Sequence, residues 1–226
     1  MHNVRGQWEN GERSGPSVGA THRGLRETVQ EALRTAIIEG TYAQGERLIE
    51  EEIAVRFDVS RNPIREALHA LAIDGFVVVE PRRGARVATI DARRCRELFE
   101  LRAPLEGLVA KLAATRRSSQ QLAELRAVVN EGVGAAEEGR LEDLPGLNTE
   151  FHRRLAAAAD NELLANTLAR LSGIIQWVYS ARIKQRSTMS WREHAAIVEA
   201  VAAEDPVLAE RCGFEHISAA AAVYAD

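Results

Sequence analysis

The stretch from Val59 to Leu71 constrains the fold of this chain more than any other. If it is helical, Arg61 and Arg65 lie four residues apart on one face. The apolar side chains of the opposite face are Ile64, Ala67, Leu68 and Leu71. Ser60 is placed to cap the first turn, and Pro63 lies within that turn, where a missing N–H costs little. The pattern therefore predicts a helix that packs on one side and presents arginines on the other.

The segments on either side of this helix complete a recognisable arrangement. A second short amphipathic pattern covers Glu50 to Phe57, and only two residues separate its end from Ser60, which is typical of a helix-turn-helix. Downstream, a β-branched run over 76–80, a turn over 81–84 and an apolar alternation over 85–88 predict a β-hairpin. Together these segments predict a winged helix-turn-helix.

The arginines of this unit indicate DNA as the partner. Arg61 and Arg65 on a helix can enter the major groove, where Arg pairs bidentately with guanine. Arg82 and Arg83 at the hairpin tip can meet phosphates or the minor groove. The alternative is a surface helix whose arginines are merely solvated, but the extra arginines of the hairpin favour DNA binding.

Composition does not by itself indicate nucleic acid. The net charge is -4 and the pI about 5.9, and residues 23–90 contain ten Arg against eleven acidic residues, so attraction to phosphate must come from local placement. Cys95 and Cys212 are spaced for neither a zinc knuckle nor a redox motif and are expected to be buried free thiols. Without an apolar span or signal segment in the sequence, we expect a cytoplasmic protein and no membrane partner.

The remaining chain divides into a tail, the winged unit and a long helical region. Residues 1–20 are polar and Gly-rich and are expected to form a disordered tail, with the winged domain over 21–88. Residues 89–226 show helical patterns and no strand signal. Breakers divide them into six helices, near 91–116, 119–138, 143–158, 161–184, 190–203 and 206–224. Their expected N-caps are Asp91, Ser118, Asp143, Ser190 and Asp205. The predicted fold is mainly α, an N-terminal winged helix-turn-helix with a small β-hairpin wing followed by a C-terminal all-α six-helix bundle.

Polar residues on inward faces of that bundle are the candidates for a ligand site. Asn148 and His152 project from one side of a helix, while His194 and His216 are flanked by apolar residues on two other helices. Each histidine alone is more often a hydrogen-bonded core or surface residue. Three histidines with an open metal position also describe a hydrolytic enzyme, but Glu193 lies roughly 100° around its helix from His194 and is a poor general base.

The first seventy or so residues after the tail resemble a known family. The segments 40–48, 59–68, Asp74-Gly75-Phe76 and Arg83-Gly84 are similar to the DNA-binding domain of the GntR family of bacterial transcription regulators. The resemblance implies that Arg61 and Arg65 read operator bases. It also implies backbone or base-edge contacts for Ser60 and Asn62 and close approach of the wing at Gly84. One departure is Glu51, where the family usually has a basic residue, which predicts weaker operator binding or a different register of contacts.

The helical region resembles the ligand-binding domain called FCD, found in the FadR branch of that family. The resemblance lies in 97–106, 148–152, Asp160-Asn161, 191–194 and His216. It implies a homodimer on a palindromic operator, a small organic acid as effector, and a divalent metal, either zinc, nickel or manganese. The implied metal ligands are Asn148, His152, His194 and His216, and Arg102 would receive the carboxylate of the acid.

Asn148 stands where many members of that branch have an aspartate. An amide oxygen brings no charge, so we expect metal and carboxylate to bind cooperatively, each poorly alone. The overall expectation is a DNA-binding regulator whose operator affinity the acid controls, with repression relieved by the acid. A regulator with a metal-free histidine cluster is the alternative within the same family.

Overall fold

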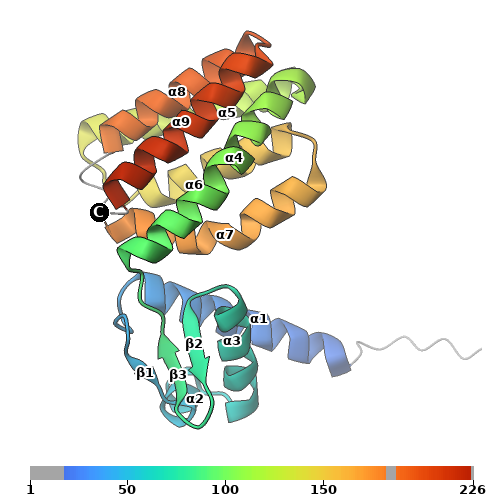
Figure 1. Ribbon diagram of the computed structural model, residues 1–226. Helices are drawn as coiled ribbons and strands as arrows, with labels where there is room; N and C mark the ends of the chain where they lie inside the picture. The colour runs from blue at the N-terminus through green and yellow to red at the C-terminus, as the bar shows by residue number, and fades with distance from the viewer. Residues whose placement is uncertain (1–17, 182–186, 225–226) are drawn as a thin grey trace, which may run out of the picture.

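The structure is a computed structural model that describes residues 18–181 and 187–224 (Figure 1). The first helix, α1 (Val18–Ile38), begins inside the range 1–20 that we predicted to be a disordered tail and earlier than the helical pattern from Leu25 suggested. The rest of that predicted tail lies outside the described residues. The structure has two hydrophobic cores, one within the C-terminal half and one in the N-terminal half that also includes Ile174 and Trp177.

The N-terminal half is a winged helix-turn-helix, as predicted. Its elements after α1 are β1 (Arg47–Leu48), α2 (Glu50–Phe57), α3 (Arg61–Ile73), β2 (Val77–Glu80) and β3 (Gly84–Val87). The strands form an antiparallel sheet in the order β1-β3-β2. Strand β1, which pairs with Ala85 and Arg86, was not predicted. A strand of two residues is too short to show the alternation of apolar and polar side chains by which strands are predicted.

The turn between α2 and α3 sets the angle of the two helices. Asp58 closes α2 in the left-handed conformation, with φ 52°. Ser60 then stands at the N-cap of α3 in extended conformation, as predicted, but its side chain makes no capping hydrogen bond. The buried face of α3 carries Ile64, Ala67, Leu68 and Leu71, which packs α3 against α1 and leaves its arginines outside.

The C-terminal half is a helical bundle. In its described part it contains α4 (Ala92–Arg116), α5 (Ser119–Glu138), α6 (Leu144–Ala158), α7 (Glu162–Ala181), α8 (Ser187–Ala202) and α9 (Pro206–Tyr224). None of the helices among the described residues is both long and apolar enough to cross a membrane. Cys95 and Cys212 are free thiols, Cys95 buried and Cys212 half-buried, and burial raises the pKa of the Cys212 thiol.

Three of the five predicted N-caps act as such. The side chains of Asp91, Ser118 and Asp205 accept hydrogen bonds from the first turns of α4, α5 and α9. Asp143 precedes α6 without a side-chain capping bond. The prediction for Ser190 is wrong, because α8 begins at Ser187 and Ser190 is a buried residue within it.

Helices α4 and α9 pack together most closely, and glycines make this possible. A Cβ on Gly213 would lie 2.9 Å from the Glu106 carbonyl oxygen, and one on Gly107 would lie 3.0 Å from the Glu210 carbonyl oxygen. The backbones therefore meet where only glycine fits. This contact places Gly213, one turn before His216, against the backbone of Glu106.

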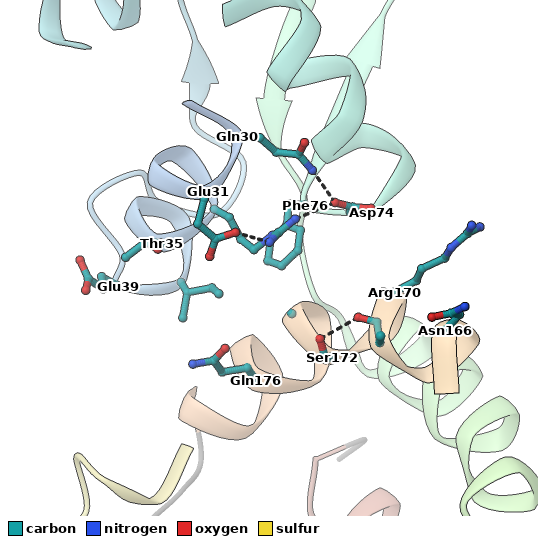
Figure 2. A pocket seen from close by; sticks show the side chains of 14 residues that line it. Gln30, Glu31, Thr35, Glu39, Asp74, Phe76, Asn166, Arg170, Ser172 and Gln176 are labelled. Carbon is teal, nitrogen blue, oxygen red and sulfur yellow. Dashed lines mark hydrogen bonds and ion pairs between the residues drawn. The ribbon is translucent and has the colours of Figure 1, made fainter. Parts of the chain in front are cut away.

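The two halves meet through α7. In Figure 1, α7 is the bundle helix that faces α1. The Trp177 ring stacks on Phe76 at a centroid distance of 5.5 Å, and Gly173 lies against the same phenyl ring. Arg94 donates a hydrogen bond of 2.7 Å to the Gly75 carbonyl oxygen. A polar cleft of about 740 Å³ remains between α1 and α7, with Gln30 and Glu31 on one wall and Arg170 and Gln176 on the other (Figure 2).

Candidate DNA-binding surface and ligand site

The residues predicted to meet DNA are all exposed. They are Ser60, Arg61, Asn62, Arg65, Arg82, Arg83 and Gly84. The first four lie at the start of α3, Arg82 and Arg83 lie in the turn between β2 and β3, and Gly84 is the first residue of β3. Figure 1 shows the start of α3 and this turn at the end of the molecule away from the helical domain. A duplex can therefore approach both without meeting the bundle.

Two residues in the left-handed backbone conformation form the tip of the wing. Arg82 has φ 65° and Gly84 has φ 85°, and the Arg83 amide donates a hydrogen bond to the Glu80 carbonyl oxygen at 3.1 Å. A Cβ on Gly84 would meet no atom within 4 Å, so glycine serves the backbone conformation there and not intramolecular packing. The Arg83 guanidinium stands 3.8 Å from Glu80 and is 79% exposed, which leaves it available to a phosphate.

The structure brings the three predicted histidines together. His152 of α6, His194 of α8 and His216 of α9 each offer a ring nitrogen, and these nitrogens lie within 4.8 Å of one another. His194 and His216 are buried, and their Nε2 atoms are 3.1 Å apart. Two imidazole nitrogens bound to one ion at about 2.1 Å each lie roughly 3 Å apart, so the spacing suits a shared metal.

Two carboxylates that sequence reasoning did not assign orient these rings. His152 donates from Nδ1 to Glu106 at 3.1 Å, and His216 donates from Nδ1 to Glu193 at 2.7 Å. These bonds fix the tautomers in which Nε2 carries the lone pair. Glu193 was considered only as a base next to His194 and instead reaches across to His216. The sequence feature that could have indicated a role for Glu106 is its spacing of four residues from Arg102, which places the two side chains on the same face of a helix.

Burial controls the protonation of this cluster. Burial lowers the pKa of His152 to about 4, although Glu106 acts in the opposite direction, so the imidazole is neutral and able to bind a metal at pH 7. Burial would raise the pKa of Glu106, but the cationic partners and their hydrogen bonds outweigh it and bring the pKa to about 2. With His152 neutral, Arg102 is the partner that keeps this carboxylate ionised.

A cavity of about 330 Å³ opens beside His152. His152, Arg102 and Asn148 line it on one side, and α7 lines it on the other. Asn148 is 3% exposed, and its side chain makes no hydrogen bond to another described residue. The His152 Nε2 atom is likewise buried without a partner among the described residues. An unpaired buried polar atom is costly, and His152 lines this cavity, as expected where a ligand completes the site.

Arg102 reaches this cavity but is already engaged. Its Nε and one terminal nitrogen each lie 2.9 Å from one oxygen of Glu106, and the Arg102 side chain is 5% exposed. Its remaining N–H groups are the ones available to a bound acid.

The sequence offers Trp177, Tyr179, Trp191 and Arg182 as candidates for the pocket, although aromatic residues on bundle helices are more often core. Tyr179 lines a small cavity next to Arg102 and His216. Trp191 is core, with Gly132 against its ring, and Trp177 belongs to the contact with Phe76. Arg182 lies outside the described residues.

Fold and sites define a class: a DNA-binding transcription regulator with an α-helical effector domain. The pattern of the FCD domain matches residues 97–219, and that of the bacterial regulatory proteins of the gntR family matches residues 25–87. The chain therefore belongs to the GntR family of regulators, with an FCD domain like that of the FadR branch.

Curated relatives and solved structures agree with this assignment. The chain is 30% identical over 195 residues to the HTH-type transcriptional repressor RspR of Escherichia coli (strain K12), covering 85% of this chain and 86% of that one. It is 29% identical over 189 residues to the HTH-type transcriptional regulator YdhC of Bacillus subtilis (strain 168), covering 82% and 84%. The structure of E. coli McbR/YncC superposes with a TM-score of 0.74 over 88% of this chain and 96% of that one, at 22% identity. The family and these relatives are regulators and not enzymes.

Proposed function

We propose that this chain is a homodimeric repressor of a palindromic operator, released by a small organic acid that binds on a divalent metal in the helical domain. The observation that carries the proposal is the histidine cluster, whose His152 lines a cavity together with Arg102 and α7. Repression is favoured by the relatives named repressors, RspR among them. A location in the cytoplasm, where the DNA is, stays a prediction.

The proposed metal ligands are His152, His194, His216 and Asn148. Neutral imidazoles and an amide oxygen suit zinc, nickel or manganese. When bound, the ion would supply a positive charge that holds the carboxylate of the acid. The residues of this chain orient that site, because Glu106 and Glu193 fix the tautomers of His152 and His216.

The charges around the site favour an anionic effector. Arg102 and Glu106 cancel each other, and Asn148 brings no charge where many FCD domains have aspartate. Glu193 contributes one negative charge through His216. A divalent ion would therefore leave about one positive charge at the cavity, which a carboxylate can neutralise. This supports the expectation that metal and acid bind cooperatively.

DNA binding is proposed to use two copies of the winged domain. One domain reaches only half of a palindrome, so two copies related by a twofold axis would place two α3 helices in successive major-groove segments. Arg61 and Arg65 would read bases, with Ser60 and Asn62 beside them on base edges or backbone. Arg82, Arg83 and Gly84 of the wing would meet the backbone or the minor groove.

Calorimetry on the metal-stripped full chain tests the ligand site. We expect zinc, nickel or manganese to bind at least tenfold more tightly in the presence of a small carboxylate such as acetate or succinate than without it, because the anion neutralises the excess charge. Asn148→Asp should tighten metal binding in the absence of carboxylate and reduce this cooperativity. His152→Ala should abolish metal binding, while His69→Ala, an exposed histidine of α3, should leave it unchanged.

Two results would contradict the proposal. Equal metal affinity with and without any carboxylate would remove the cooperative site. No metal binding by the wild-type chain and its His69→Ala control would favour a regulator with a metal-free pocket.

A further inference from the structure

Glu50, the first residue of α2, contacts both arginines at the start of α3. Arg65 donates to the two carboxylate oxygens, from Nε at 3.1 Å and from Nη2 at 2.9 Å. Arg61 places its Nη2 at 3.6 Å from the second of these oxygens. Among the described residues, neither guanidinium has another partner.

This contact is particular to Glu50. Glu51 and Glu52 follow it in the same turn, are exposed, and pair with no arginine in the described structure. The Glu50 side chain is 28% exposed, and its hydrogen bond with Arg65 lowers the pKa of the carboxyl group, so it stays ionised at neutral pH. A bidentate arginine–carboxylate pair holds the planar guanidinium in one orientation.

The pair with Glu50 leaves the terminal edge of the Arg65 guanidinium available to DNA. A guanidinium has five N–H groups, and the pair with Glu50 uses the side formed by Nε and Nη2. The opposite end, formed by Nη1 and the second hydrogen of Nη2, remains a two-pronged donor. Such a fork matches the O6 and N7 acceptors of guanine in the major groove.

We infer that Glu50 is a positioning residue that determines how strongly this regulator distinguishes its operator from other DNA. The inference rests on the proposed reading of bases by Arg61 and Arg65. Glu50 acts in two ways. It holds the Arg65 guanidinium before DNA arrives, so that less side-chain freedom is lost on base contact. It also offsets the charge of both arginines, which reduces attraction to phosphates of any sequence.

Four variants of the full chain separate position from charge. Glu50→Gln removes the charge and weakens the pair. Glu50→Asp keeps the charge but withdraws the carboxylate by one methylene. Glu51→Gln removes the same charge from the neighbouring residue of the same turn. Arg65→Ala removes the proposed base contact itself.

The measurement is a ratio of two affinities. The wild-type chain first selects a preferred duplex from a random-sequence library, and fluorescence anisotropy then gives the affinity of each variant for that duplex and for a scrambled duplex of equal composition. We expect Glu50→Gln and Glu50→Asp to lower the ratio of the two affinities about tenfold, the discrimination carried by one bidentate contact. Glu51→Gln should raise both affinities by a similar factor and keep the ratio within about twofold. Circular dichroism checks that all variants are folded.

The outcomes distinguish the inference from the proposal beneath it. If Arg65→Ala lowers the ratio but neither Glu50 variant does, positioning by Glu50 is wrong while base reading stands. If Glu50→Gln and Glu51→Gln raise both affinities equally and Glu50→Asp resembles the wild type, Glu50 acts by charge alone and the inference is overturned. If Arg65→Ala lowers both affinities equally, Arg65 does not read bases, and both the inference and the role proposed above for Arg65 are wrong.

Discussion

At the scale of single residues, α4 offers the same ion pair in two environments. Arg102 and Glu106 are spaced i,i+4 and almost completely buried, whereas Arg93 and Glu97 have the same spacing and are 80% and 59% exposed. A buried charge that loses its partner is costly, while an exposed pair contributes little.

We therefore expect Glu106→Gln to lower the free energy of unfolding of the metal-stripped protein by about 3 kcal/mol. Glu97→Gln, the matched control on the same helix, should change it by less than about 0.5 kcal/mol. Urea denaturation followed by circular dichroism measures both. Equal losses for the two variants would mean that burial does not decide the strength of these pairs.

At the scale of the elements, the spacing of α5 and α8 depends on one glycine. A Cβ on Gly132 would lie 2.3 Å from the Trp191 ring, which is fully buried. The Trp191 ring also packs edge-on against the His194 ring, at a centroid distance of 4.7 Å. The contact between Gly132 and Trp191 therefore helps to hold His194 in place.

Gly132→Ala should destabilise the fold by about 2 kcal/mol, because the indole cannot move without disturbing its neighbours. Gly134→Ala is the control, since the Cβ of that residue of α5 would meet no atom within 4 Å. It should stabilise the helix by up to about 1 kcal/mol. Thermal unfolding distinguishes the two, and destabilisation by both would show that helix geometry and not the Trp191 contact is limiting.

At the scale of the whole molecule, α7 lies between the ligand cavity and the DNA-binding domain. Asn166, Ala169 and Ser172 line both the cavity beside His152 and the cleft that faces α1. One turn further on, Trp177 stacks on Phe76, at the base of the wing. A ligand that shifts α7 can therefore change the position of the winged domain, provided that it binds the two arrangements with different affinity.

We expect Trp177→Ala to reduce the change in operator affinity caused by metal and carboxylate to less than about twofold, against the roughly 5- to 150-fold typical of such coupling. Calorimetry should still detect both ligands, since Trp177 lines neither cavity described above. Leu163→Ala, on the same helix and 79% exposed, is the control and should keep full coupling. Unchanged coupling in Trp177→Ala would exclude this contact as the route.

The sequence by itself determined most of the helices and the wing, and the arginines of Arg61–Ile73 that face outward, but not the short strand Arg47–Leu48. Helical periodicity, caps such as Ser118 and the turn before Ser60 are local, so they could be read without knowing what packs on them. Tertiary structure alone decided which side chains meet. The pairing of Glu50 with Arg65, the reach of Glu193 to His216 and the double role of α7 depend on how helices are rotated against one another. That rotation is fixed by core packing between distant segments, for which a local pattern carries no signal.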